Sequence, residues 1–190
     1  MEIYNENVND LLDPSKKNLK IREDKSKQEV VVDGLSKFEV TSVEEIMAYI
    51  RKGNETKIMA EHKMSDQSSR SHTVFKIEVM VMEKNTQTSR KIINSSEINL
   101  VDLAGSEGVA KMQLQGLRAK EGNNINKSLL ALSNVIYKLG QKFQYVNFRD
   151  SKLTRILQKS LQGNSQIAII CTLNQNRSNH CESIGTINFG

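Results

Sequence analysis

The sequence contains no tryptophan, one proline and two cysteines, and aromatic residues make up only 5% of its 190 positions. So few aromatic side chains leave little for the base-stacking platforms with which proteins read single-stranded nucleic acids. No apolar run approaches the roughly 20 residues that span a bilayer, and the first residues lack the basic start and apolar stretch of a signal peptide. We therefore expect a cytosolic or nuclear chain, and these features give little support for nucleic acid or a membrane as its partner.

The two cysteines, Cys171 and Cys181, are too few for a disulfide framework, and a cytosolic chain keeps its thiols reduced. We interpret both as small packing residues. The alternative is a metal site formed by Cys171, His180 and Cys181. A structural zinc site takes four ligands, however, and these residues supply three.

The charged residues leave a formal net charge of +5. This excess predicts attraction to a polyanion, which could be nucleic acid, an acidic membrane or an acidic protein surface. The content of 37% hydrophobic and 26% charged residues is ordinary for a soluble globular protein. Because Pro14 is the sole proline and no repeat or linker interrupts the chain, we predict a single domain over residues 1–190.

Several segments have the pattern of β-strands. Short apolar segments predict strands at residues 2–4, 19–21 and 29–32. Asp33 and Gly34 supply a turn after the third of them. Period-two alternation predicts a longer strand from His72 to Met82, followed by a polar hairpin loop at residues 84–90. The apolar run at residues 98–103 is typical of a central, buried strand.

Helical patterns alternate with these strands. Ser42 and Glu45 form a capping-box signature for a helix of about three turns that ends near Gly53. Apolar residues at helical spacing predict a helix at about residues 119–139 and a second that starts near Ser151 and stops at Gly163 and Asn164. An apolar strand at 167–173 follows. The alternation predicts an α/β fold with a central mixed sheet flanked by helices.

One segment, Asn99–Glu107, has the pattern of a nucleotide-sensing switch. An apolar strand ends there in Asp102, which can hold a magnesium ion through water. Gly105, just beyond, lets a backbone N–H group approach a phosphate closely. A tight turn with an aspartate cap explains the same residues and stays open as an alternative.

A second segment, Ser68–His72, gathers three hydroxyl groups and a guanidinium in a loop. Hydroxyls can bind magnesium or pass on a proton, and arginine can pair with a carboxylate or stabilise phosphate charge. A solvated serine-rich loop is the alternative. The two segments in this order, about thirty residues apart, are more specific than either alone.

The motifs together resemble those of kinesin motor domains. LVDLAGSE at Leu100–Glu107 is similar to the kinesin switch II, and SSRSH at Ser68–His72 to switch I. Four further stretches agree in the same order: EIYNENVNDLLDP at residues 2–14, KEGNNINKSLLALSNVI at 120–136, FRDSKLTRILQKSL at 148–161 and GNSQIAIICTL at 163–173. The resemblance covers the C-terminal two-thirds of such a domain, from before switch I through the last strand and the start of a helix. IRED at residues 21–24 and KM before SSRSH hint at centromere-associated mitotic kinesins.

The resemblance implies a microtubule-stimulated ATPase that uses ATP and Mg²⁺ to move along microtubules. Ser68 and Ser69 would contact magnesium and relay a proton, and Asp102 would hold a magnesium-bound water. Gly105 would sense the γ-phosphate. Arg70 would pair with Glu107, and this ion pair would close the two switches as a two-state latch.

The resemblance also places the microtubule-binding surface on the helix after switch II and on the loop and helix that follow. Positive charge toward acidic tubulin would come from Lys127, Lys138, Lys142, Arg149, Lys152 and Arg155. The alternative is a solvated basic face. Residence on cytoplasmic microtubules, with the spindle or kinetochore as a narrower location, and dimerisation only through a stalk outside this chain are further expectations.

The phosphate-binding loop GxxxxGK[ST] of such enzymes does not occur among the 190 residues. We therefore expect a partial P-loop NTPase fold that lacks the N-terminal strands, and a chain that is inactive by itself. Three positions also depart from the kinesin pattern, namely Ser65, Gly108 and Asn147. A non-catalytic microtubule-binding or scaffold fragment that has lost ATP turnover is the alternative function.

Overall fold

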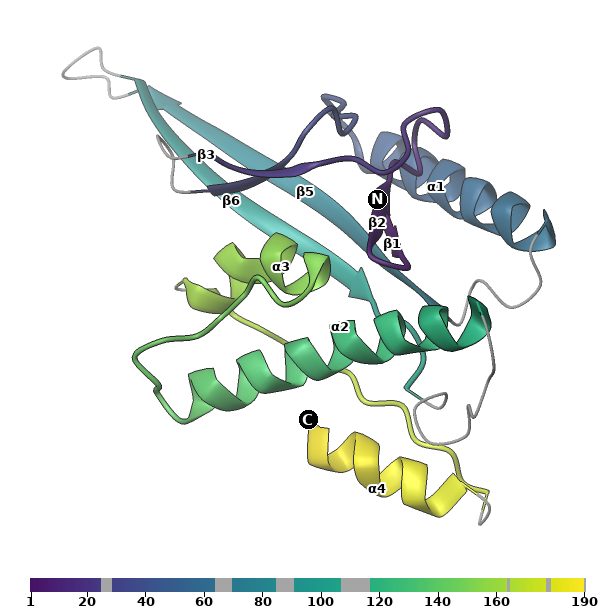
Figure 1. Cartoon of the computed structure of the whole chain (residues 1–190). Coiled ribbons are helices and arrows are strands. Elements are labelled where there is room, and N and C mark those ends of the chain that lie inside the picture. The colour runs from purple at the N-terminus through teal and green to yellow at the C-terminus, as the bar shows by residue number, and fades with distance from the viewer. Residues whose placement is uncertain are drawn as a thin grey trace.

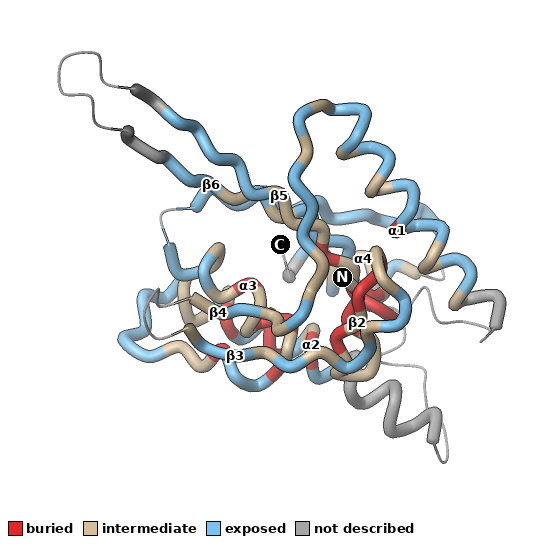
Figure 2. Tube along the Cα trace, turned by 90° about the horizontal axis from the view of Figure 1, so that it is seen from above, coloured by how far each residue is buried: buried red, intermediate tan, exposed pale blue. Residues whose placement is uncertain are grey.

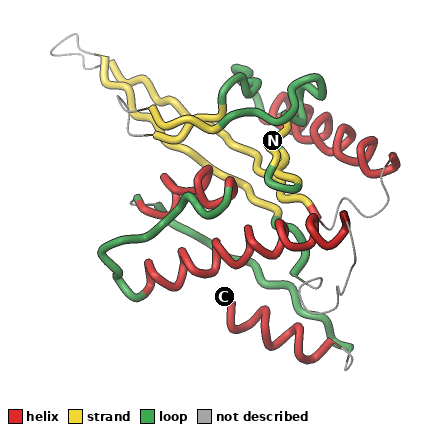
Figure 3. The backbone as a smooth tube through the Cα atoms, viewed as in Figure 1, coloured by secondary structure: helices red, strands yellow, loops and turns green. Residues whose placement is uncertain are grey.

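The computed structural model describes residues 1–24, 29–63, 70–84, 91–106, 117–163, 165–176 and 179–189. Its centre is a four-stranded sheet in the order β2-β1-β5-β6 (Figures 1 and 3). These strands are β1 (Glu2–Tyr4), β2 (Asn7–Asn9), β5 (Ser71–Lys84) and β6 (Lys91–Asp102). A two-stranded sheet pairs β3 (Ile21–Asp24) with β4 (Glu29–Val32). The α/β class is confirmed, although all neighbouring strands described are antiparallel, without the parallel pairs of a mixed sheet.

The long hairpin of β5 and β6 is the largest feature of the sheet. Its register runs without interruption from Thr73 opposite Asp102 to Lys84 opposite Lys91. The start of β5 and the end of β6 therefore lie at the same end of the sheet. At that end β1 pairs with the other edge of β5, with Ile3 opposite His72.

Helices cover both faces of this end of the sheet. Successive side chains of a strand point to opposite faces. Thr73 accepts a hydrogen bond from Lys57 of α1 (Val43–Lys63) at 3.0 Å, whereas the neighbouring His72 contacts α2 (Leu117–Gly140). Helices α1 and α2 accordingly lie on opposite faces of the sheet (Figure 1).

The apolar core lies between the sheet and the helices α2 and α3 (Lys152–Gln162). Its buried members are Ile3, Val8, Val74, Leu132, Leu153 and Leu157. Each fully buried aliphatic side chain contributes roughly 1.5–3 kcal/mol by leaving water. Figure 2 shows the buried residues gathered around β2, α2 and α3, whereas the outer part of β5 and β6 is exposed.

Polar contacts at both ends determine where α3 begins and stops. The Ser151 hydroxyl accepts a hydrogen bond from the Thr154 amide at 3.1 Å, as an N-cap does. A carboxylate oxygen of Glu6 accepts the Lys152 amide at 2.9 Å, so the turn between β1 and β2 also contacts this helix start. Gly163 forms the C-cap. The predicted limits of this helix are confirmed.

The helices predicted from periodicity are present, but one is longer than predicted. Helix α1 runs for 21 residues and passes through Gly53, where the sequence predicted its end. Gly53 is buried, with Leu11 and Leu12 beside the place that a Cβ atom would occupy, so tertiary packing favours the helix across it. The N-cap half of the capping box is confirmed, because the Glu45 amide donates to the Ser42 hydroxyl at 3.2 Å, whereas the Glu45 carboxylate accepts from the Thr41 amide at 2.7 Å. Periodicity did not locate α4 (His180–Phe189).

Two predicted apolar strands are corrected by the structure. Strand β6 lies at the edge of the described sheet, and Ile98, Leu100 and Val101 are exposed there instead of buried. Residues 165–176 form no strand, and Ile170 is 90% exposed. A strand requires a partner for its backbone groups, and no described strand pairs with this segment.

Two smaller predictions also change, one for the cysteines and one for a strand. Cys171 and Cys181 are exposed, so they are not packing residues. Among the described residues no group of three His, Cys, Asp or Glu side chains is placed to hold a metal ion. The strand predicted at 19–21 begins at Ile21 instead. No helix in the described ranges is long and apolar enough to cross a membrane.

Replacing Gly53 by alanine tests whether α1 tolerates a methyl group at this buried position. A Cβ atom at this position would lie 3.8 Å from Leu11 and 3.9 Å from Leu12, which are ordinary contact distances. Gly53→Ala should therefore raise the free energy of unfolding by about 0.5–1 kcal/mol, because alanine loses less backbone entropy in a helix. Denaturant unfolding measures the change. A destabilised variant would show that the position has no room for a methyl group.

Candidate functional site

The candidate site lies where β5 begins and β6 ends. Asp102 is the last residue of β6 and pairs in register with Thr73. Its carboxylate is exposed, and Lys57 Nζ lies 3.6 Å from Oδ2. The same ammonium group donates to the Thr73 hydroxyl at 3.0 Å, so α1 holds a positive charge at this end of the sheet. Lys57 was not identified from the sequence.

The turn after β6 contacts a buried histidine. The Ala104 amide donates to His72 Nδ1 at 2.9 Å. On the other side of the ring, His72 Nε2 lies 2.7 Å from the Ser128 hydroxyl of α2. Burial lowers the pKa of His72 to about 4, more than the nearby Asp102 carboxylate raises it. The imidazole is therefore neutral near pH 7.

Three of the six residues predicted for the nucleotide switches are described by the structure. Arg70 comes directly before β5, Asp102 ends β6, and Gly105 lies three residues further on. The hairpin register brings their backbone segments to one end of the sheet. The remaining residues, Ser68, Ser69 and Glu107, lie outside the described residues, and the predicted Arg70–Glu107 ion pair stays a prediction.

The donor set at this end fits a magnesium nucleotide in part. Mg²⁺ prefers oxygen ligands and keeps several of its waters. The exposed Asp102 carboxylate at the strand end can accept such a water, and Gly105 presents a turn without a side chain beside it.

The predicted microtubule-binding residues lie on α2, on the loop after it and on α3. Lys127 and Lys142 are exposed, and Lys138 and Lys152 are half-buried. Arg149 forms a bidentate pair with Glu23 of β3, with its Nη2 at 2.8 Å from Oε1 and 3.0 Å from Oε2. Arg155 Nη2 lies 3.6 Å from the same carboxylate.

The contact with Glu23 changes the interpretation of two predicted residues. From the sequence, Arg149 and Arg155 were predicted to supply positive charge toward tubulin. The structure places both beside one carboxylate from β3. Sequence separation concealed this pairing, since Glu23 precedes Arg149 by 126 positions. The IRED motif, which served as a subfamily hint, contains this acid.

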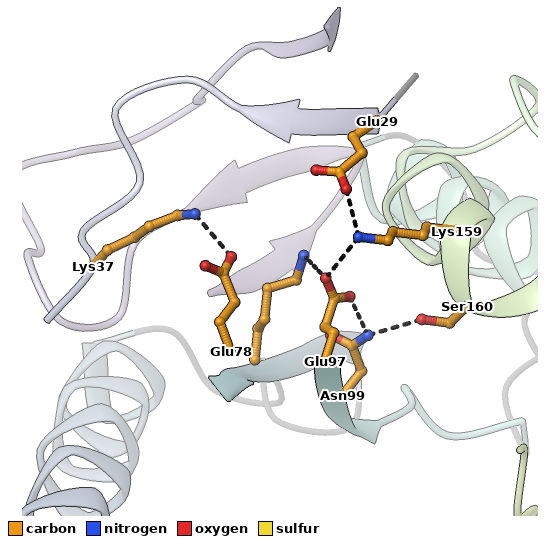
Figure 4. Close-up of polar contacts among 8 residues, drawn as sticks. Glu29, Lys37, Glu78, Glu97, Asn99, Lys159 and Ser160 are labelled. Carbon is orange, nitrogen blue, oxygen red and sulfur yellow. Dashed lines mark hydrogen bonds and ion pairs between the residues drawn. The ribbon is translucent and has the colours of Figure 1, made fainter. Parts of the chain in front are cut away.

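A polar network joins α3, β4 and the central hairpin (Figure 4). Lys159 Nζ lies 2.6 Å from Glu29 and 3.9 Å from Glu97, and Glu97 also accepts from Lys76 at 2.8 Å. Asn99 Nδ2 donates to both Glu97 and Ser160 of α3. Burial acts to raise the pKa of Glu97, but the hydrogen bonds from Lys76 and Asn99 outweigh it and hold the pKa below 4.5.

The network fixes α3 against the sheet from which the switch segments emerge. A second ion pair, Lys37 Nζ to Glu78 at 2.9 Å, links the loop after β4 to β5 beside it (Figure 4). Elements from three parts of the chain are thus tied to the β5–β6 hairpin. Movement of α3 relative to the hairpin would have to break several of these contacts together.

Comparison with known proteins identifies the family. The chain matches the kinesin motor domain over residues 1–190. It is 47% identical to Kinesin-related protein 4 of Dictyostelium discoideum, 44% to Kinesin-like protein KIN-7L of Oryza sativa subsp. japonica and 43% to Kinesin-like protein KIF13A of Homo sapiens. All of this chain aligns in each case, with 10%, 30% and 11% of the respective relative. The chain belongs to the kinesin motor domain family.

A solved structure agrees with this assignment. The chain superimposes on a structure described as a fast kinesin with a TM-score of 0.85 and 42% sequence identity, covering all of this chain and 52% of that one. The kinesin motor fold is thereby confirmed. The expected similarity to centromere-associated mitotic kinesins finds no support, because the relatives named above carry KIN-7, KIF13A and Kinesin-related protein 4 names.

Glu97 provides a pH test of the polar network. Its folded-state pKa is lowered, so its contribution to stability is present above the ordinary value of 4.5 and is lost as the pH falls through the folded-state pKa. Glu97→Gln should lower the free energy of unfolding at pH 7 by about 1 kcal/mol, because it removes charge-assisted hydrogen bonds. The difference from wild type should shrink below pH 4.5. Urea unfolding at both pH values measures it.

The matched control is Glu39→Gln, which removes the same charge at an exposed loop position. This variant should differ little from wild type at either pH. If Glu97→Gln were equally stable with wild type at pH 7, the network would contribute nothing measurable to the position of α3.

Proposed function

We propose that this chain forms the part of a microtubule-based motor in which ATP hydrolysis is coupled to movement along the microtubule. One observation carries the proposal. The register of β5 with β6 brings the segment before β5, which contains Arg70, and the Asp102–Gly105 turn to the same end of one sheet. Two loops that must meet across a triphosphate have to emerge side by side, and this register supports such an arrangement.

The residues in the two segments have complementary tasks. Asp102 would hold a water of the magnesium ion, together with Ser68 and Ser69 of the preceding loop. Gly105 would offer its N–H group to the γ-phosphate, and Arg70 would pair with Glu107 when both loops are drawn inward. Bound Mg-ATP would supply the phosphoryl group whose loss releases this pair.

The basic residues of α2, the following loop and α3 would form the track-binding surface. It consists of Lys127, Lys138, Lys142, Arg149, Lys152 and Arg155. Positive charge favours association with the acidic surface of tubulin and speeds the encounter. Lys127 and Lys142 are exposed and form no ion pair with the residues that the structure describes, which favours them for this role.

The narrower expectations follow from this function. Microtubule stimulation of the ATPase and residence on cytoplasmic microtubules are part of the proposal. A spindle or kinetochore location rested on the subfamily hint alone, and dimerisation would require a stalk outside this chain. The matched relatives are longer proteins, of which the chain covers between 10% and 30%, and their remaining parts would determine cargo and assembly.

The proposed Arg70–Glu107 ion pair can be tested in the full-length protein, because the effects of the two substitutions on kcat should not add. Arg70→Ala and Glu107→Ala should each lower microtubule-stimulated kcat roughly 10²-fold, as loss of a transition-state contact does. The double variant should be no slower than either single one, because both changes remove the same ion pair. Arg51→Ala is the matched control, because Arg51 is an exposed residue of α1. Fully additive losses would show that the two residues act separately.

The track surface can be tested by charge reversal. Lys127→Glu together with Lys142→Glu should weaken microtubule binding of the full-length protein roughly tenfold, because two attractions become repulsions. Lys52→Glu is the control, since Lys52 is exposed on α1 at the opposite face of the sheet. Cosedimentation with and without ATP gives the affinities.

Two results of that assay would contradict the proposal. Unchanged binding of the double variant would refute the track surface. Wild-type binding that ignores nucleotide, with no microtubule-stimulated ATP turnover, would favour the scaffold function instead of a motor.

A further inference from the structure

His72 is placed between the switch II turn and the long helix α2. It is only 2% exposed, and its ring makes one hydrogen bond on each side. The Ala104 amide lies 2.9 Å from Nδ1, and the Ser128 hydroxyl lies 2.7 Å from Nε2. Ala104 and Ser128 are themselves buried, so water does not compete for either bond. The imidazole therefore joins Ala104 to Ser128, which lies 24 positions further along the chain.

The hydrogen bonds determine which tautomer the ring adopts. An amide N–H group can only donate, so Nδ1 must carry a lone pair. In the neutral ring the proton is then on Nε2, which donates to the Ser128 oxygen. The charged groups that act on its protonation are Asp102 at the end of β6, which favours the charged ring, and Lys57 of α1, which disfavours it. A neutral ring with one acceptor and one donor satisfies both neighbours at once.

The backbone of His72 is held in the central sheet. His72 lies in β5, which pairs with β1 on one side and β6 on the other, and Ile3 is directly opposite it. The neighbouring Val74 is 1% exposed. A side chain anchored in this way shifts little by itself, so a displacement of the Ala104–Gly105 turn must either break the bond to Nδ1 or carry the ring with it.

The far end of this contact lies beside the proposed track surface. Ser128 follows Lys127 directly on α2, and the next turns of the same helix lead to Lys138. A helix is stiff over this length, so a shift at Ser128 moves the basic side chains as a unit.

We propose that His72 is a positioning residue that couples the Ala104–Gly105 turn to helix α2 and thereby passes nucleotide-dependent movement of the turn to the track-binding surface. This inference rests on the proposed motor function and adds to it the residue that links its two sites. His72 touches neither substrate nor reacting atoms. Its effect is a coupling free energy between nucleotide and microtubule, which is reciprocal between the two ligands.

Two variants cut the link at different atoms without removing the fold's apolar core. His72→Asn keeps an oxygen near the position of Nδ1 that can accept the Ala104 amide, but does not reach Ser128. Ser128→Ala leaves the ring in place and removes its partner on α2. Ser133→Ala is the matched control, because Ser133 is five residues further along α2 and hence about 140° around the helix from Ser128.

The first measurement is the ratio of microtubule Kd values of the full-length protein in ADP and in a non-hydrolysable ATP analogue. His72→Asn and Ser128→Ala should each reduce this ratio about fivefold or more, within the usual range of allosteric coupling. Basal ATP turnover of Ser128→Ala without microtubules should stay within about twofold of wild type, and Ser133→Ala should preserve the ratio. A purely structural histidine would instead lower the thermal midpoint and leave the ratio unchanged, which would overturn the inference.

The second measurement does not depend on motor activity. Hydrogen–deuterium exchange of the peptide containing Ala104 should become faster in Ser128→Ala, because the ring loses its second anchor. Unchanged exchange in Ser128→Ala would overturn the link itself. If the wild-type protein binds microtubules equally in both nucleotides, the proposed function fails, and the coupling role fails with it. A normal wild-type ratio that both variants retain refutes only the role of His72.

Discussion

The continuous antiparallel pairing of β5 with β6 is the constraint on which the rest of this structure depends. Because one strand starts where the other ends, the segments before Ser71 and after Asp102 share one end of the sheet. The alternation of side chains along β5 then assigns the helices to opposite faces, with α1 meeting Thr73 and α2 meeting His72. A slip of the register by one residue would exchange these faces and separate the contacts.

Helices were predictable from the sequence because their signals are local. The limits of α3 follow from the N-cap Ser151 and the C-cap Gly163, and the apolar spacing of α2 is complete within its own residues. Helix α1 shows where a local signal fails. Gly53 has the pattern of a helix end, yet it is buried beside Leu11 and Leu12, which precede it by about forty positions of the sequence, and the helix continues through it.

Strands and polar pairs were less predictable because their partners are distant. The apolar run at 167–173 has the composition of a buried strand, but composition does not supply a neighbouring strand to accept its hydrogen bonds. The motifs of the switches were visible in the sequence, whereas the contact of His72 with Ser128 and that of Lys57 with Asp102 were not. A lone histidine in a hydroxyl-rich motif was the one available signal, and only the fold shows which way its ring faces.

The bidentate contact between Arg149 and Glu23 makes any encounter with an acidic partner a competition between carboxylates. Because Arg149 is already paired with Glu23, it would contribute to the binding free energy only the difference between its old and its new ion pair. Its contribution to affinity would be smaller than the formal charge implies, and so would its response to ionic strength. Glu23 would then compete with the carboxylates of the partner for Arg149, and a weakly acidic surface would not displace it. The contact would therefore favour selective binding over strong binding.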